Sequence, residues 1–134
     1  MRPPGDPLHP TFIPAELATL DHTVLDALRP PLLDIDLLSE LVTLFLTDAP
    51  IRMALLHKAV ATGPPLAIAE AAHTLKSASS NLGALRVVVL CNRLEVTARQ
   101  GDTAAARQMA DTIEVELGRA LLALRTEVER TRPG

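Results

Sequence analysis

Apolar residues recur every three or four positions along most of this chain, which is the spacing of one face of an α-helix. The pattern predicts one short helix over residues 15–28 and four long helices after it. The apolar positions of the first long helix are Leu38, Leu41, Val42, Phe45, Ala49, Met53, Leu56 and Val60. Each such stripe needs a neighbour to bury it, so we expect the helices to pack against one another.

Residues that begin or end helices separate these runs. They are Asp34 or Asp36, Gly63 with Pro64-Pro65, Gly83, Gly101 and Asp102. Aspartate caps the free amides at a helix start, proline suits the first turn, and glycine ends a helix. Pro50 lies inside the first long helix, where it removes one backbone donor, so we expect it to bend a single helix rather than divide it.

The composition favours a helical domain. The 134 residues suit one domain, and 48% of them are hydrophobic while only 1% are aromatic, which favours helices packed through small side chains over a sheet. We predict an all-α fold, an antiparallel up-down-up-down four-helix bundle over residues 15–130 with a short additional N-terminal helix. Residues 1–14 contain five prolines and read as an arm or linker that is poorly ordered unless docked. Residues 131–134 read as a tail.

Charge and cysteine content exclude several classes of function. The net charge is −3 and Phe12 and Phe45 are the only aromatic residues, so there is no basic patch or stacking surface for nucleic acid. Cys91 is the single cysteine and reads as a small core residue rather than a reactive thiol. No apolar run approaches the roughly 20 residues of a membrane span, and we expect a cytoplasmic chain with no membrane contact.

His73 is the residue of greatest chemical interest. With about 100° per residue, Ile68, Ala71, Leu75, Ala78 and Leu82 fall on the opposite side of the predicted helix. The residues that share the outer face with the histidine are Leu66, Ala69, Lys76, Ser77 and Ser80. No Cys, second His or carboxylate stands at the third or fourth position after His73, and Glu70 is the only nearby acid, so the sequence supports no metal site.

The other titratable residues carry little signal. His22 and His57 have no partner at ligand spacing and are expected to be solvated, and His9 lies in the arm. The charged residues from Arg119 to Arg132 read as the solvated face of the last helix, with Glu127 and Arg130 forming a weak pair.

Five segments of the chain resemble histidine-containing phosphotransfer (HPt) domains. They are Leu44 to Pro50, Ala72 to Ser77, Asn81 to Ala84, Leu90 to Glu95 and Ala98 to Asp102. The resemblance spans roughly residues 17 to 128, with the helix order and gap lengths intact.

The resemblance implies that His73 accepts a phosphoryl group from the aspartyl phosphate of one receiver domain and relays it to the aspartate of another. Lys76 would stabilise the phosphoryl charge, and Gly83 would let the chain turn behind the site. The chain would bind no cofactor, because the receiver supplies Mg²⁺, and it would act as a carrier without turnover of its own. It would work alone or as the C-terminal module of a hybrid sensor kinase.

The docking surface follows from the small side chains around His73. Ala69, Ser77 and Ser80 are short enough to admit the partner's aspartate, and Leu66 is expected to form part of an apolar docking patch. Ser77 stands where many family members have glycine, and its hydroxyl can bond a phosphoryl oxygen. The apolar stripes can all be used within one bundle, so we expect a monomer.

Two other functions fit the same residues. One is a helical interaction module that binds and regulates a receiver or another signalling protein without taking phosphate. The other is a helical adaptor in which His73 is incidental.

Overall fold

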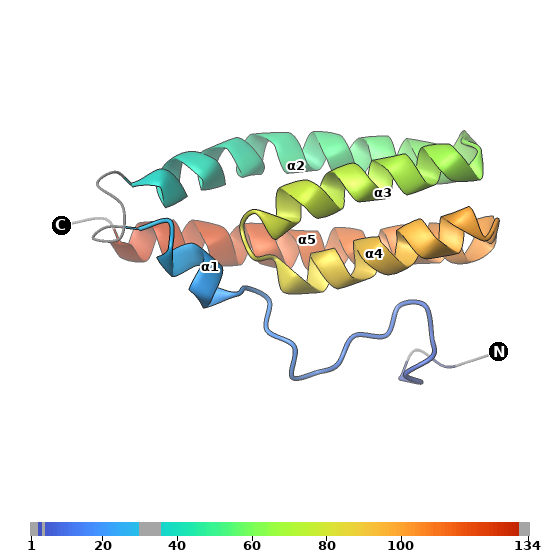
Figure 1. The fold of residues 1–134 in the computed structure, drawn as a ribbon, viewed down its shortest axis with the longest axis horizontal. Coiled ribbons are helices and arrows are strands. Elements are labelled where there is room, and N and C mark those ends of the chain that lie inside the picture. The colour runs from blue at the N-terminus through green and yellow to red at the C-terminus, as the bar shows by residue number, and fades with distance from the viewer. Residues whose placement is uncertain (1–2, 4, 30–35, 132–134) are drawn as a thin grey trace.

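The computed structural model describes residues 3, 5–29 and 36–131, and Figure 1 shows their arrangement. The helices are α1 (His22–Asp26), α2 (Leu37–Thr62), α3 (Pro65–Ser80), α4 (Leu85–Arg99) and α5 (Thr103–Thr131). No strand occurs in these described ranges, and the predicted all-helical fold is confirmed. None of the described helices is long and apolar enough to cross a membrane.

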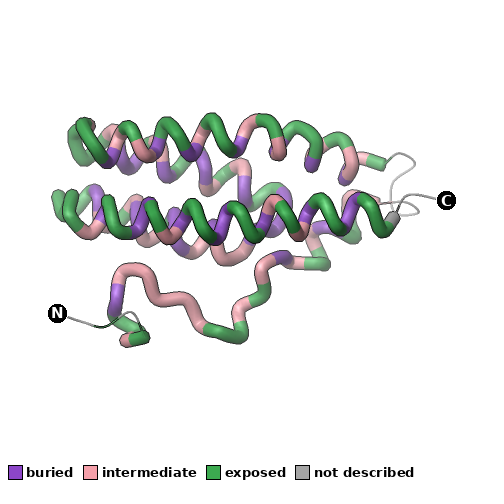
Figure 2. Tube along the Cα trace, turned by 180° about the vertical axis from the view of Figure 1, so that it is seen from behind, coloured by how far each residue is buried: buried purple, intermediate pink, exposed green. Residues whose placement is uncertain are grey.

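The four long helices lie side by side and bury their apolar faces against one another (Figures 1 and 2). Contacts join α2 to α3, α3 to α4, α4 to α5 and α5 to α2. The buried residues of α2 are the predicted stripe except for Leu41, which is only partly buried. The core is built mainly from Leu, Ala and Val, and Phe45 is its one buried aromatic among the described residues.

The predicted helix boundaries agree with the capping contacts. An Asp36 carboxylate oxygen accepts a hydrogen bond from the Ser39 amide at 3.1 Å, and Asp102 does the same for Ala105 at 3.1 Å. Pro65 occupies the first turn of α3, directly after Gly63 and Pro64. The alternative cap, Asp34, lies outside the described residues.

Pro50 lies within α2, which continues as one helix from Leu37 to Thr62. The prediction of a single helix is therefore confirmed. Proline has no N–H to donate to the Leu46 carbonyl, but Pro50 is exposed and Leu46 is only partly buried, so the acceptor that loses its partner is not enclosed in the core. The bend at this position stays a prediction.

The predicted helix over residues 15–28 is wrong in its extent, because α1 contains only five residues. The segment before it bonds to the turn between α3 and α4 instead. The Asp21 amide donates to the Gly83 carbonyl at 2.8 Å, and the Leu85 amide donates to the Thr19 carbonyl at 3.2 Å. The Asp21 carboxylate then caps α1 by accepting from the Thr23 amide at 3.0 Å. These long-range bonds use backbone groups that a helix would need for itself.

The N-terminal arm docks along α4 (Figure 1). His9 is buried, and the Arg93 guanidinium donates to the Phe12 carbonyl. Arg86 donates to the carbonyls of Pro14 at 3.3 Å and Leu17 at 2.9 Å. The described part of the arm therefore lies against α4, and its role as a flexible arm or linker stays a prediction.

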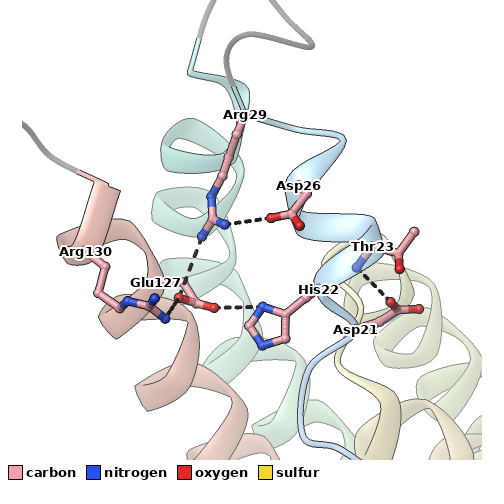
Figure 3. Close-up of polar contacts among 7 residues, drawn as sticks. All are labelled: Asp21, His22, Thr23, Asp26, Arg29, Glu127 and Arg130. Atoms are coloured by element: carbon pink, nitrogen blue, oxygen red, sulfur yellow. Dashed lines mark hydrogen bonds and ion pairs between the residues drawn. The ribbon is translucent and has the colours of Figure 1, made fainter.

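The charged face predicted for the last helix is wrong at Glu127, which is buried. One of its carboxylate oxygens lies 3.0 Å from His22 Nδ1, and the other lies 3.0 Å from the Arg130 guanidinium and 3.7 Å from that of Arg29 (Figure 3). Another α5 carboxylate, Glu116, is also buried and bonds Arg86 at 2.6 Å. Glu127 thus contacts the N-terminal segment directly, and Glu116 binds Arg86, which donates to the carbonyls of that segment.

The histidines predicted to be solvated have acidic neighbours. His22 is exposed but paired with Glu127, as described above. His57 Nε2 lies 3.3 Å from a Glu114 carboxylate oxygen, across the groove between α2 and α5. Spacing along one helix could not indicate either pair, because each joins two different segments.

Candidate functional site on helices α3 and α4

His73 lies near the middle of α3 with 60% of its side chain exposed. The predicted outward direction of this histidine is correct. The buried stripe of α3 is rotated from the predicted one, however, and consists of Ile68, Ala69, Ala72, Leu75 and Ser79. Ala71 and Ala78 are only partly buried against the core. The rotation arises because α3 packs between α2 and α4 rather than facing one neighbour.

The predicted position of Ala69 is wrong. The sequence places it on the outer face beside His73, but it is fully buried and belongs to the core. It lies one turn before His73 on α3, and His73 and Lys76 both contact Glu95 of α4, so a larger side chain at this position is expected to disturb the packing of the two helices. Ala69 does not form part of an exposed docking surface.

Helix α4 supplies two side chains that complete the surroundings of His73. The Nδ1 atom of His73 lies 3.0 Å from Oε1 of Glu95. The same oxygen accepts a hydrogen bond from Lys76 Nζ at 3.2 Å, and Asn92 Oδ1 lies 3.4 Å from that nitrogen. One carboxylate oxygen thus joins the histidine and the lysine.

This contact determines which nitrogen of the neutral imidazole carries the proton. A carboxylate only accepts hydrogen bonds, so the partner nitrogen of His73, Nδ1, is assigned the proton. In the neutral ring Nε2 then carries the lone pair. Nε2 makes no hydrogen bond to any residue that the structure describes. The exposed ring nitrogen is therefore the nucleophilic one.

Glu95 is held in its ionised form. Burial by itself raises the pKa of this carboxyl, but the hydrogen bond from Lys76 and then that from His73 outweigh it, with help from both positive charges, and the pKa is lowered from 4.5. The Glu95 side chain is 17% exposed; its contact with Lys76 is partly buried, and its contact with His73 is open to solvent. A negative charge therefore lies beside Nδ1 of His73 at neutral pH.

The remaining predicted docking residues are exposed on the His73 side of α3. They are Leu66, Ser77 and Ser80. The Ser77 hydroxyl donates to the His73 carbonyl at 3.1 Å, so it is bonded to its own helix in this state. The docking roles of these three residues stay predictions.

Gly83 lies in the turn between α3 and α4 with a φ of +64°. A Cβ at this position would lie 3.0 Å from the Asp21 carbonyl oxygen and 3.2 Å from Cβ of Val24. The glycine is therefore required by the turn and also by the close approach of the segment that contains α1.

Sequence reasoning missed Glu95 and Asn92, because it searched for partners of His73 along one helix. Both residues lie within a segment that carried the family resemblance. A further signal was available, since Glu95 directly follows the buried Leu94 and is four positions after the buried Cys91. A carboxylate at the border of an apolar stripe needs a partner from a neighbouring helix.

Cys91 is buried beneath this site, and burial raises the pKa of its thiol to about 12, against the opposing charge of Lys76. The thiol stays protonated at neutral pH and cannot act as a nucleophile. Its predicted role as a core residue agrees with this position.

Comparisons with known proteins point to one family. A family model described as "Hpt domain" matches residues 40–132. The crystal structure of histidine-containing phosphotransfer protein B from Pseudomonas aeruginosa PAO1 is similar, with a TM-score of 0.76 and 30% sequence identity over 85% of this chain and 97% of that chain. A comparison with curated protein sequences found no match.

Proposed function

This chain belongs to the Hpt domain family, and on that premise we propose that it is a phosphorelay carrier that uses His73. It accepts a phosphoryl group on Nε2 from the aspartyl phosphate of one receiver domain and passes it to the aspartate of another. The observation that carries this proposal is the exposed imidazole, whose Nδ1 lies 3.0 Å from Glu95 with Lys76 on the same carboxylate.

The chemistry requires little of this chain beyond position and charge. The Nε2 lone pair attacks phosphorus, the N–P bond forms, and the bond from phosphorus to the aspartate oxygen breaks, so the carboxylate leaves with that electron pair. The proton stays on Nδ1, and no general base is needed. The ring gains positive charge in this step, and the Glu95 carboxylate stabilises it. Such transfers depend mainly on alignment and electrostatics.

Lys76 contributes the positive charge that the phosphoryl oxygens need. Lys76 lies about one turn after His73 on α3. Its ammonium contacts Glu95 and Asn92 of α4. From there it can turn toward a phosphoryl group on Nε2. The receiver supplies Mg²⁺ and the acidic residues that bind it, and the metal neutralises phosphoryl charge on that side. The chain itself acts as a carrier without turnover of its own.

The proposal also covers the order of the helices, the oligomeric state, the cellular location and the partners of this chain. We propose an antiparallel up-down-up-down order of the four long helices, since short connections favour antiparallel neighbours. The domain acts as a monomer in the cytoplasm, alone or as the C-terminal module of a hybrid sensor kinase. Its partners are receiver domains.

The decisive experiment is phosphoryl transfer with a matched histidine control. Purified receiver domains charged with radioactive acetyl phosphate are mixed with the wild type, His73→Gln and His22→Gln. Both histidines are 60% exposed with Nδ1 3.0 Å from a glutamate oxygen. We expect acid-labile, alkali-stable label on the wild type and on His22→Gln, and none on His73→Gln.

Other outcomes separate the competing functions. Receiver binding that survives His73→Gln, with no label on the wild type, would identify an interaction module that takes no phosphate. A chain that neither binds receivers nor becomes labelled would be an adaptor in which His73 is incidental. Label that persists in His73→Gln would place the acceptor elsewhere.

A further inference from the structure

The arm contains a hydrogen-bonded turn that holds a leucine out into solvent. The His9 amide donates to the Asp6 carbonyl at 2.8 Å, and the Leu8 amide donates to an Asp6 carboxylate oxygen at 2.9 Å. Pro7 occupies the second position of this turn, where its fixed φ is favourable. Leu8 follows at the third position and is 69% exposed.

The turn is attached to α4 by the residues that follow it. His9 is buried, and its Nδ1 accepts from the Thr11 amide at 3.1 Å. The Phe12 carbonyl accepts from the Arg93 guanidinium of α4. Because the residues that follow the turn are attached to the bundle, the turn holds Leu8 at a defined place beside α4.

A groove of about 320 Å³ lies between this turn and the outer face of α4. Its lining includes Leu8, Pro10 and Val96, which are apolar, and Asn92. Val96 is half exposed. Asn92 also lies 3.4 Å from Lys76 Nζ, so one side chain belongs both to the groove and to the surroundings of His73.

We propose that the turn over residues 6–9 and Val96 of α4 form a second contact area for the receiver domain that exchanges phosphoryl groups with His73. This inference rests on the proposed function, since it takes the receiver as the partner. The contact area recognises an apolar side chain on the receiver, outside its phosphorylation pocket.

The surface around His73 and the groove beside Val96 are continuous, which is why we infer that the same receiver contacts both. Asn92 and Val96 are one helical turn apart, about 6 Å along α4. A stable protein interface covers about 800 Å² on each partner. A receiver that places its aspartate at His73 therefore extends over the neighbouring turn of α4, where Val96 and Leu8 lie. Exposed apolar side chains at that place contribute to affinity once they are covered.

The test compares three leucine or valine variants for phosphoryl transfer. Leu8→Asp and Val96→Asp change the proposed contact area. Leu122→Asp is the matched control, since Leu122 is 66% exposed but lies on α5, beside the segment before α1. A receiver charged with acetyl phosphate that labels the wild type is the probe, and the initial transfer rate is measured against the concentration of the chain.

We expect Leu8→Asp and Val96→Asp to raise the half-saturating concentration roughly tenfold, because each replaces an apolar side chain that the receiver covers with a charge that it would have to desolvate. The maximal rate should stay within about twofold of the wild type, because the groups around His73 are unchanged. Leu122→Asp should match the wild type in both quantities. Circular dichroism of each variant checks that the helices are intact.

The results distinguish the two levels of the proposal. If Leu8→Asp and Val96→Asp behave as Leu122→Asp does while His73 is still labelled, the second contact area is wrong and the proposed function stands. A lower maximal rate with an unchanged half-saturating concentration also overturns the contact area, because it places the effect on the chemical step. If no receiver labels the wild type, the proposed function and this inference both fail.

Discussion

At the scale of single residues, His73 and His22 have nearly the same local geometry. Each is 60% exposed, and each has Nδ1 3.0 Å from a glutamate oxygen. The two histidines differ in the other residues that their glutamate partners contact. Glu127 is surrounded by arginines at the end of the bundle, whereas Glu95 shares its oxygen with Lys76, three positions from His73 on the same helix. A lysine on the same helix that shares the carboxylate oxygen, and not the histidine–carboxylate pair, distinguishes the candidate phosphoryl acceptor.

A prediction at this scale concerns Glu95. Glu95→Ala removes the acceptor for the Nδ1 proton of His73, and we expect transfer at saturating receiver to slow by about 10-fold or more, as for other residues that orient a reacting histidine. Glu95→Gln keeps an oxygen that accepts from Nδ1 but loses the negative charge that stabilises the ring, so its rate should lie between those of the wild type and Glu95→Ala. Rapid-quench measurement of label on His73 gives both rates.

A second measurement separates positioning from a merely structural role. The ¹⁵N chemical shifts of the His73 ring report which nitrogen carries the proton. We expect the Nδ1–H form to dominate in the wild type and in Glu95→Gln, and to lose its preference in Glu95→Ala. Unchanged rates and shifts in Glu95→Ala would show that Glu95 does not orient the ring.

At the scale of elements, two glycines with positive φ end helices α3 and α4 in different surroundings. Gly83 has a φ of +64° and lies against Asp21 and Val24, as described above. Gly101 has a φ of +83°, and nothing lies within 4 Å of the place where a Cβ would be. The first glycine therefore serves both the turn and the packing of the segment around α1, and the second serves only the turn.

Substitution by alanine should reveal this difference. Gly101→Ala is expected to cost about 1 kcal/mol of unfolding free energy, since it only forces a side chain into the left-handed region. Gly83→Ala adds contacts that the neighbouring backbone must move to relieve, and we expect a total of roughly 2–4 kcal/mol. Urea unfolding measures both values, and equal losses would refute the close approach.

The short helix α1 is held to the end of α5 through Glu127. The carboxylate is buried and contacts His22 and Arg29 from the N-terminal segment (Figure 3). We expect Glu127→Gln to lower the unfolding free energy by roughly 1–3 kcal/mol, because it removes the buried negative charge that His22, Arg29 and Arg130 surround. The exposed Glu129, two positions later on α5, provides the matched control. Thermal or urea unfolding of Glu129→Gln should be within about 0.5 kcal/mol of the wild type, and a similar value for Glu127→Gln would contradict the anchoring role.

At the scale of the whole molecule, arginines attach the N-terminal segment to the bundle. Arg93 holds the Phe12 carbonyl, and Arg86 joins two carbonyls of residues 14–17 to Glu116 of α5. An irregular segment lacks the regular backbone hydrogen bonds of a helix or sheet. The two arginines therefore donate to carbonyls that would otherwise lack partners. The segment in turn packs around α1 and the turn at Gly83.

Replacing Arg86 tests whether the segment and the bundle are separable. We expect Arg86→Met to keep the helical circular dichroism spectrum while the amides of Asp6, His9 and Phe12 exchange with deuterium about tenfold faster, since local opening becomes easier. Arg99→Met changes an exposed arginine of the same helix and should leave those amides unaffected. Unchanged exchange in Arg86→Met would mean that other contacts suffice to hold the arm.

The sequence by itself determined what depends on neighbours within about four residues of the chain. It predicted the four long helices, a cap at Asp34 or Asp36 and one at Asp102, the start of α3 at Pro64-Pro65, and the outward direction of His73. Helix hydrogen bonds, capping and apolar periodicity all act over this range. For the same reason the sequence suggested Lys76, which lies on the same helix as the histidine.

Tertiary structure alone decided everything that joins one helix to another. The partner of His73 is Glu95, 22 positions away, and the burial of Ala69 depends on how closely α4 packs against α3. Likewise, Glu127 is buried because the N-terminal segment covers it, and α1 starts at His22 because the residues before it bond to the turn at Gly83. The relative rotation of packed helices sets these contacts, and a pattern read along one helix does not contain it.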